Sequence, residues 1–199
     1  MDRIIEKSRA IDKDFNEEMI EYYRENQAYF DNFGNISDLD MIEEIILIKQ
    51  KYCEALESKD HYKELSVILK HIYILLAKIK SKSQKYDFYY ERALFYEGIV
   101  LGRQRKYTLS NHKFKELQLI DSKNESYNNW FQSNKKNVFD NRLSVCEGSI
   151  MMITFFTVLF GKYIFGRYNF HILIVVFLSF IGTFLYSHFY RKRNSKMKD

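Results

Sequence analysis

The residues of this chain that could do chemistry are carboxylates and histidines, and their spacing matches no known catalytic pattern. His61 and His71 are ten residues apart, whereas two metal ligands on one helix are commonly four residues apart. The sequence also lacks the H-E-x-x-H, G-x-x-x-x-G-K-[ST], G-x-S-x-G and paired C-x-x-C motifs. We therefore expect no enzymatic activity, no metal site and no cofactor. The acidic residues that gather along one segment are interpreted as a solvated helix face: Glu43, Glu44, Glu54, Glu57 and Asp60.

The charges of the chain separate two regions. Residues 1–148 contain 24 basic and 25 acidic residues, while residues 149–199 contain 7 basic residues and 1 acidic residue. The basic character therefore belongs mostly to the C-terminal quarter, where anionic lipids would attract lysine and arginine. The aromatic residues elsewhere do not form the basic and aromatic platform that single-stranded nucleic acid requires. We expect contact with lipid and none with nucleic acid.

Two long apolar runs in this quarter predict a transmembrane hairpin over residues 148–190. The runs Gly148–Phe165 and Phe170–Phe189 contain 18 and 20 residues. At about 1.5 Å per residue they span roughly 27 and 30 Å, which is close to the hydrocarbon thickness of a bilayer. Lys162 lies near the end of the first run, from which its ammonium group can reach the interface. The alternative is a pair of soluble core helices, which would normally carry a polar stripe.

The basic residues also predict the orientation of this hairpin. Most of them flank its outer sides, and only Lys162 and Arg167 lie near its turn, so both termini should be cytoplasmic. The charged first 19 residues lack the apolar core of a signal peptide, which agrees with that orientation. The Lys-, Asn- and Ile-rich composition favours a multi-pass protein of a bacterial inner membrane. The residues expected at the membrane interfaces are Lys162, Tyr163, Arg167, Tyr168, Tyr186, Tyr190, Arg191, Lys192 and Arg193.

The remaining sequence predicts an all-α fold. Apolar residues recur every three or four positions, strand patterns are lacking, and the chain contains no proline to interrupt a helix. We expect a helical domain over residues 1–137, a basic linker over 138–147 and a basic tail over 191–199. Ser37 or Asp38 should cap the second helix. Cys53 and Cys146 would both face the reducing cytoplasm, so no disulfide is expected. The expected helices are Ile11–Phe33, Leu39–Glu57, Tyr62–Ile79, Phe88–Gln104, Leu109–Ile120 and Asn124–Asn137.

An internal repeat lies within this helical region. The stretch YEGIVLGRQRKYTLSNHKFKELQLIDSKN has small and aromatic residues at characteristic positions, namely Gly98, Tyr107, Ser110, Phe114 and Leu117. A weaker copy, shifted back by 45 residues, places Cys53, Tyr62, Leu65, Leu69 and Ile72 at the equivalent positions. The two copies resemble tetratricopeptide repeats over about residues 40–124. A generic helical bundle is the alternative interpretation.

The resemblance implies a function in binding. Tetratricopeptide proteins hold a peptide or helix of a protein partner on the surface built mainly by the first helix of each unit. We therefore expect a membrane-tethered cytoplasmic adaptor, with self-association left open. The alternatives are a membrane-acting effector and a small subunit of a membrane complex, in which the hairpin itself would carry the activity. By position, the resemblance implies that the partner-binding residues are Gln50, Glu54, Glu57, Arg92, Phe95, Ile99 and Arg103.

Overall fold

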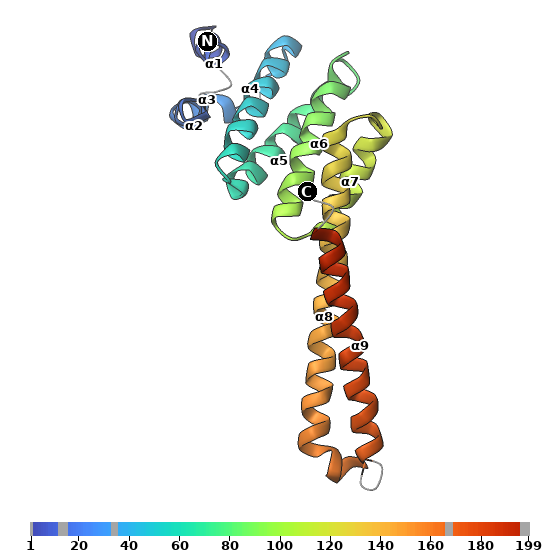
Figure 1. The fold of residues 1–199 in the computed structure, drawn as a ribbon. Helices are drawn as coiled ribbons and strands as arrows, with labels where there is room; N and C mark the ends of the chain where they lie inside the picture. Colours follow the sequence, from blue (N-terminus) through green and yellow to red (C-terminus); the bar gives the residue numbers. More distant parts are fainter. Residues whose placement is uncertain (1, 12–15, 33–35, 166–168, 196–199) are drawn as a thin grey trace. The chain divides into compact units, whose positions relative to one another are not determined.

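The computed structural model describes residues 2–11, 16–32, 36–165 and 169–195, and these residues form helices joined by short connections, with no strand among them (Figure 1). The predicted all-α class is thus confirmed. The chain divides into two compact units, Met1–Lys135 and Lys136–Asp199, and each is described by itself.

The first unit is a row of helices in which sequence neighbours pack against one another. α4 packs against α5, α5 against α6 and α6 against α7, while α2 packs on α4 and α4 also touches α6. Consecutive long helices run antiparallel (Figure 1). A single core of isoleucine, leucine, tyrosine and phenylalanine side chains joins them. The helices of this unit are α1 Asp2–Ala10, α2 Asn16–Glu25, α3 Gln27–Asp31, α4 Leu39–Ser58, α5 Tyr62–Ile79, α6 Tyr86–Arg103 and α7 Tyr107–Ile120.

The expected first helix differs from the structure. α2 ends at Glu25 and α3 begins at Gln27, because the side chain of Asn26 donates a hydrogen bond to the Tyr22 carbonyl at 2.9 Å. Such a bond offers the backbone an alternative to a continuous helix. Residues 12–15 and 33, which that prediction included, lie outside the described residues. Of the two expected caps of α4, Asp38 is the one observed: its carboxylate accepts a hydrogen bond from the Asp40 amide at 3.1 Å.

The two copies of the predicted repeat end their first helices in the same way. After α4, the His61 amide bonds to the Leu56 carbonyl at 2.9 Å, and Asp60 has a φ of 59°. After α6, which lies 45 residues later, the Lys106 amide bonds to the Leu101 carbonyl at 2.9 Å, and Arg105 has a φ of 61°. Both are Schellman motifs, which terminate a helix with one left-handed residue. The next helix then begins at the equivalent residues, Tyr62 and Tyr107.

α6 and α7 approach each other closely at Gly98. A Cβ atom added there would lie 2.9 Å from the ring of Phe114, which is fully buried. The Ser110 hydroxyl donates a hydrogen bond to the Gly98 carbonyl at 2.6 Å, and the Asn134 side chain donates to that hydroxyl at 2.6 Å. The small residue of the repeat pattern therefore lies where α6 and α7 approach closely, and any side chain there would force Phe114 or α7 to shift.

α8 Glu125–Phe165 begins in the first unit, and the second unit consists of the rest of α8 together with α9 Asn169–Ser195. The two helices run antiparallel (Figure 1). Residues 166–168, which connect them, lie outside the described part. Residues 138–147, expected as a linker, are helical within α8. Within the seam between α8 and α9, the rings of Phe139 and Tyr190 lie 4.4 Å apart.

Many large apolar side chains of this unit are exposed. These exposed residues are Met151, Met152, Ile153, Phe155, Phe156, Leu159, Phe160, Ile174, Val175, Phe177, Leu178, Ile181, Phe184, Leu185, Tyr186 and Phe189. In the part of the chain that the structure describes, no helix has an apolar stretch of the length and hydropathy needed to cross a membrane.

Candidate functional site

The structure brings together two of the predicted partner-binding residues of opposite charge. The Arg92 guanidinium, on α6, donates a hydrogen bond to the Glu54 carboxylate of α4 at 3.3 Å. Its carbon also lies 5.8 Å from the ring centroid of Phe88, one helical turn earlier and exposed. Arg92 is thus held by both an ion pair and a cation–π contact. Glu57, one turn after Glu54, is partly exposed.

Two other predicted binding residues, Gln50 and Ile99, lie inside the first unit, and a third, Phe95, is partly buried. Ile99 is 2% exposed, and Gln50 is fully buried with its side-chain nitrogen donating to the Tyr89 carbonyl at 2.7 Å. Phe95 packs between α7 and α8, with its ring 6.0 Å from Phe114 and 5.5 Å from Tyr127. A partner could touch Gln50 or Ile99 only if the helices separated. A binding surface in this conformation must therefore be built from the remaining positions.

Arg103 occupies the most distinctive surface site. Its guanidinium carbon lies 5.3 Å from the ring centroid of Tyr62 and 5.8 Å from that of Trp130. The arginine is exposed at the end of α6, while the two rings come from the start of α5 and from α8. We call Tyr62, Arg103 and Trp130 the arginine–aromatic surface. Among the described residues, no carboxylate forms an ion pair with Arg103, so its guanidinium contacts two rings while its N–H groups can still meet a carboxylate from outside.

The two aromatic partners of Arg103 were not predicted as functional residues. The sequence analysis matches Tyr62 only to a repeat position, and Trp130 falls within the expected helix Asn124–Asn137 without a role. The rings are firmly placed: Trp130 stacks on Phe114 with centroids 5.7 Å apart, and the Tyr62 hydroxyl donates to Asp60 at 2.6 Å. Burial, that hydrogen bond and the nearby carboxylates raise the pKa of Tyr62 to about 12. No sequence spacing signals this arrangement, because its members come from three helices.

Tyrosine hydroxyls link neighbouring helices of the first unit to carboxylates. Tyr73 of α5 donates to Glu97 of α6 at 2.6 Å, and Tyr127 of α8 donates to Glu91 of α6 at 2.6 Å. Two further pairs join α6 to α7 and α4 to α5, Tyr90 with Glu116 and Tyr52 with Glu64. Burial, followed by the bond to Glu116, raises the pKa of Tyr90 to about 12. These bonds satisfy polar groups at the helix interfaces.

A buried lysine forms the most polar contact of the core. Lys49 of α4 has no exposed side-chain surface, and its ammonium donates to the Asp31 carboxylate and to the Tyr23 hydroxyl, each at 2.6 Å. Nδ1 of His71 lies 3.2 Å from the same carboxylate. Burial lowers the pKa of Lys49, which Asp31 partly offsets. Burial would raise the pKa of Asp31, but the bonds from Lys49 and Gln27 outweigh it and hold that pKa below its usual value.

Lys49, Asp31 and His71 are residue types that can transfer protons in an active site. Unlike the groups of an active site, however, the Lys49 side chain is not accessible to solvent. A substrate cannot reach an amine whose side chain is wholly enclosed, so we interpret Lys49 and Asp31 as an ion pair that joins α3 to α4. The sequence does carry a signal for it. Lys49 lies on the apolar stripe of α4, four residues after Ile45 and three before Tyr52, where a solvated lysine would not be expected.

The predicted acidic face of α4 is solvated only in part. Glu43 is buried: it accepts a hydrogen bond from the Ser83 hydroxyl at 2.5 Å and pairs with Lys85 at 2.9 Å. The bond from Ser83, helped by Lys85, lowers the pKa of Glu43. Glu44 pairs with Arg9 of α1 at 2.6 Å. The interpretation as a solvated face is therefore wrong for Glu43, because the loop after α5 covers it.

Two of the predicted membrane-interface residues can be located in full. Tyr186 is exposed on α9, and its ring stacks with that of Tyr190 at a centroid distance of 6.3 Å. Arg167 and Tyr168 lie outside the described residues. The side chains of the others, although they belong to α8 and α9, also lie outside the described part: Lys162, Tyr163, Arg191, Lys192 and Arg193.

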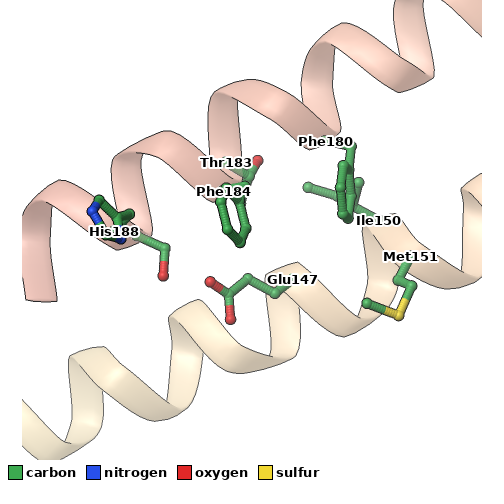
Figure 2. A pocket seen from close by; sticks show the side chains of 8 residues that line it. Glu147, Ile150, Met151, Phe180, Thr183, Phe184 and His188 are labelled. Carbon is green, nitrogen blue, oxygen red and sulfur yellow. The ribbon is translucent and has the colours of Figure 1, made fainter.

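A cavity of about 380 Å³ lies between α8 and α9 in the second unit. Figure 2 shows the Glu147 side chain extending from α8 toward α9, and His188 on the facing helix. Ile150 and Phe180 lie near each other on the facing helices and line the apolar part. Glu147 directly precedes the first apolar run and His188 lies near the end of the second, but nothing in the sequence predicts that they line one cavity.

Comparison with protein-family models, with curated proteins and with solved structures finds no match for this chain.

Proposed function

We propose that this chain is a membrane-tethered adaptor whose first unit binds an acidic segment of a protein partner at the arginine–aromatic surface. The proposal rests on one observation: Arg103 is exposed and its guanidinium lies against the rings of Tyr62 and Trp130. A guanidinium already held against two rings loses less freedom when it forms a bidentate pair with a carboxylate. An exposed cation that is already positioned in this way favours an acidic ligand over an apolar one.

The surface extends along α6 to Arg92. The two arginines are 11 residues apart, which is about three helical turns or roughly 16 Å, so they lie on the same side of the helix. Arg92 already pairs with Glu54, and a partner carboxylate there would have to compete with it. Arg103 should therefore contribute more than Arg92. Because the area is small, affinity for one copy should be modest and should rise when copies cluster on a membrane.

The tether is supported by the second unit and by the sequence. Large exposed apolar patches mark contacts with a membrane or with another protein. The two apolar runs of the sequence also continue through residues whose side chains lie outside the described part, such as 161–165 and 172–173. In the proposed arrangement the hairpin crosses the membrane twice and both termini stay in the cytoplasm.

The test uses the full-length protein in its native membrane. A photo-crosslinking residue at exposed Lys106, close in sequence to Arg103, should capture a defined partner through an acidic segment identified by mass spectrometry. We expect Arg103→Gln to abolish that crosslink and Arg103→Lys to weaken it, since lysine lacks the planar fork. The matched control, Lys123→Gln, removes an exposed basic residue away from the rings and should leave capture unchanged.

Equal capture by the wild type and by Arg103→Gln would reject the arginine–aromatic surface as the binding site. A second comparison tests the tether: residues 148–190 replaced by an unrelated two-span hairpin should preserve capture. Loss of capture after that replacement would indicate that the hairpin itself contacts the partner, as expected for a subunit of a membrane complex.

A further inference from the structure

The cavity between α8 and α9 is lined by both polar and apolar side chains. Its polar part is formed by Glu147 of α8 with Thr183, Ser187 and His188 of α9, and its apolar part by Ile150, Met151, Phe180 and Phe184. Ser187 is 3% exposed, so its hydroxyl is well removed from bulk solvent. A volume of 380 Å³ would hold roughly a dozen water molecules at about 30 Å³ each. Aromatic and aliphatic walls make a purely aqueous filling unfavourable.

The sequence position of the cavity indicates what could enter it. Glu147 directly precedes the first apolar run, and His188 is next to the last residue of the second run. If the hairpin crosses a bilayer, the polar part lies at the level of the lipid headgroups. From His188 to Phe180 the cavity reaches about 12 Å along α9, at about 1.5 Å per residue, toward the hydrocarbon. This inference thus rests on the proposed membrane tether.

We propose that the cavity is a binding site for a phospholipid with a primary ammonium headgroup, of the phosphatidylethanolamine type. The headgroup ammonium would pair with Glu147, and the hydroxyl of Ser187 or a neutral His188 nitrogen would accept a further N–H bond. The first methylenes of an acyl chain would lie against Ile150, Phe180 and Phe184. Glu147 also has an interaction elsewhere in the chain, so the lipid would be an additional partner.

Charge complementarity distinguishes this lipid from the other common headgroups. A phosphatidylglycerol headgroup carries no cation and would bring its phosphate toward a carboxylate. A choline headgroup is cationic but has no N–H to donate to Glu147 or Ser187. The ethanolamine headgroup alone among these three supplies both a positive charge and hydrogen-bond donors. Its phosphate can remain toward the basic flank of the hairpin, where Arg142 is exposed on α8.

The test is lipid competition on the full-length protein. The protein is purified in mild detergent, delipidated and exposed to equal amounts of phosphatidylethanolamine, phosphatidylcholine and phosphatidylglycerol. Retained lipids are then identified by native mass spectrometry. We expect preferential retention of phosphatidylethanolamine, weakened about tenfold or more by Glu147→Gln, as the loss of a charge-assisted hydrogen bond implies. Ile150→Trp, which fills the apolar part, should reduce retention of the same lipid.

Glu125→Gln, an exposed carboxylate on α8 outside the cavity, is the matched control and should not change retention. Equal retention of the three lipids, or a phosphatidylethanolamine preference that survives Glu147→Gln, would overturn the site. Flotation of the same proteins with vesicles separates this result from the tether. A chain that floats but shows no headgroup preference would reject only the lipid site, whereas a chain that does not float would reject the tether.

Discussion

The two units of this chain use aromatic residues in opposite ways. In the first unit, tyrosines lie at helix interfaces and donate to carboxylates of neighbouring helices, as Tyr73 does to Glu97. In the second unit, Phe155 and Phe177, like Leu178, are exposed on a pair of helices. In the first arrangement the tyrosine hydroxyls and the carboxylates satisfy one another, and the unit buries much of its own apolar surface. The second leaves its apolar surface to be covered by something other than the pair itself, and it is there that we propose lipid.

The largest expected effect comes from breaking the buried polar contact of the first unit. Asp31→Asn removes the charge that balances Lys49, whose side chain is wholly enclosed. We expect the free energy of unfolding to fall by about 3 kcal/mol, at the lower end for broken buried pairs because Asp31 is 23% exposed. Urea unfolding of the full-length protein in mild detergent, followed by the fluorescence of Trp130, measures this loss.

Trp130 is a suitable reporter because it is the only tryptophan of the chain and stacks on Phe114 in the first unit. Glu17→Gln is the control. It removes a carboxylate that pairs with Lys59 at 2.5 Å on the exposed surface, and it should leave the unfolding midpoint unchanged. If both variants shifted the midpoint equally, burial of Lys49 would not explain the stability of the pair.

The second prediction tests the outward face of the second unit. Leu178 lies near the middle of the second apolar run and is 61% exposed. An arginine at this position would be costly to place in hydrocarbon. On insertion scales Leu178→Arg costs about 3 kcal/mol, which corresponds to roughly a hundredfold weaker partition. Vesicle flotation of the full-length protein measures that partition.

Leu119→Arg provides the matched control in the first unit. Leu119 is 83% exposed on α7, and we expect its replacement to change neither flotation nor folding. Unchanged flotation of Leu178→Arg would contradict a lipid-facing position. It would favour a protein partner as the cover of the apolar side chains.

Much of the first unit could be predicted because its pattern is local. The spacing of apolar residues gave the long helices, and the 45-residue shift between Tyr62 and Tyr107 matched the starts of α5 and α7. The break at Asn26 was missed because it depends on one side chain bonding to a nearby carbonyl. Whether this repeat belongs to the tetratricopeptide family stays a prediction.

The candidate sites were harder to predict because they depend on contacts between distant segments. Arg103 was named from its place on α6, but its rings come from α5 and α8. Gln50 and Ile99 were named by the same positional reasoning and prove to be buried, because the reasoning identified the helix but not how far its neighbours cover it. Burial is a property of the packed unit, and sequence periodicity specifies it only for the apolar stripe.

The smallest expected effect comes from adding one methyl group to each unit. In Gly98→Ala the new Cβ would lie 2.9 Å from Phe114, so the ring or α7 must shift. We expect a loss of about 1–3 kcal/mol, typical of overpacking, in the same fluorescence measurement. Gly182→Ala is the matched variant, because no atom lies within 4 Å of its added Cβ. Alanine there should preserve or slightly increase the helicity of α9, followed by circular dichroism in detergent. A neutral Gly98→Ala would show that Phe114 can move away without cost, so tight packing would not explain the glycine at the α6–α7 contact.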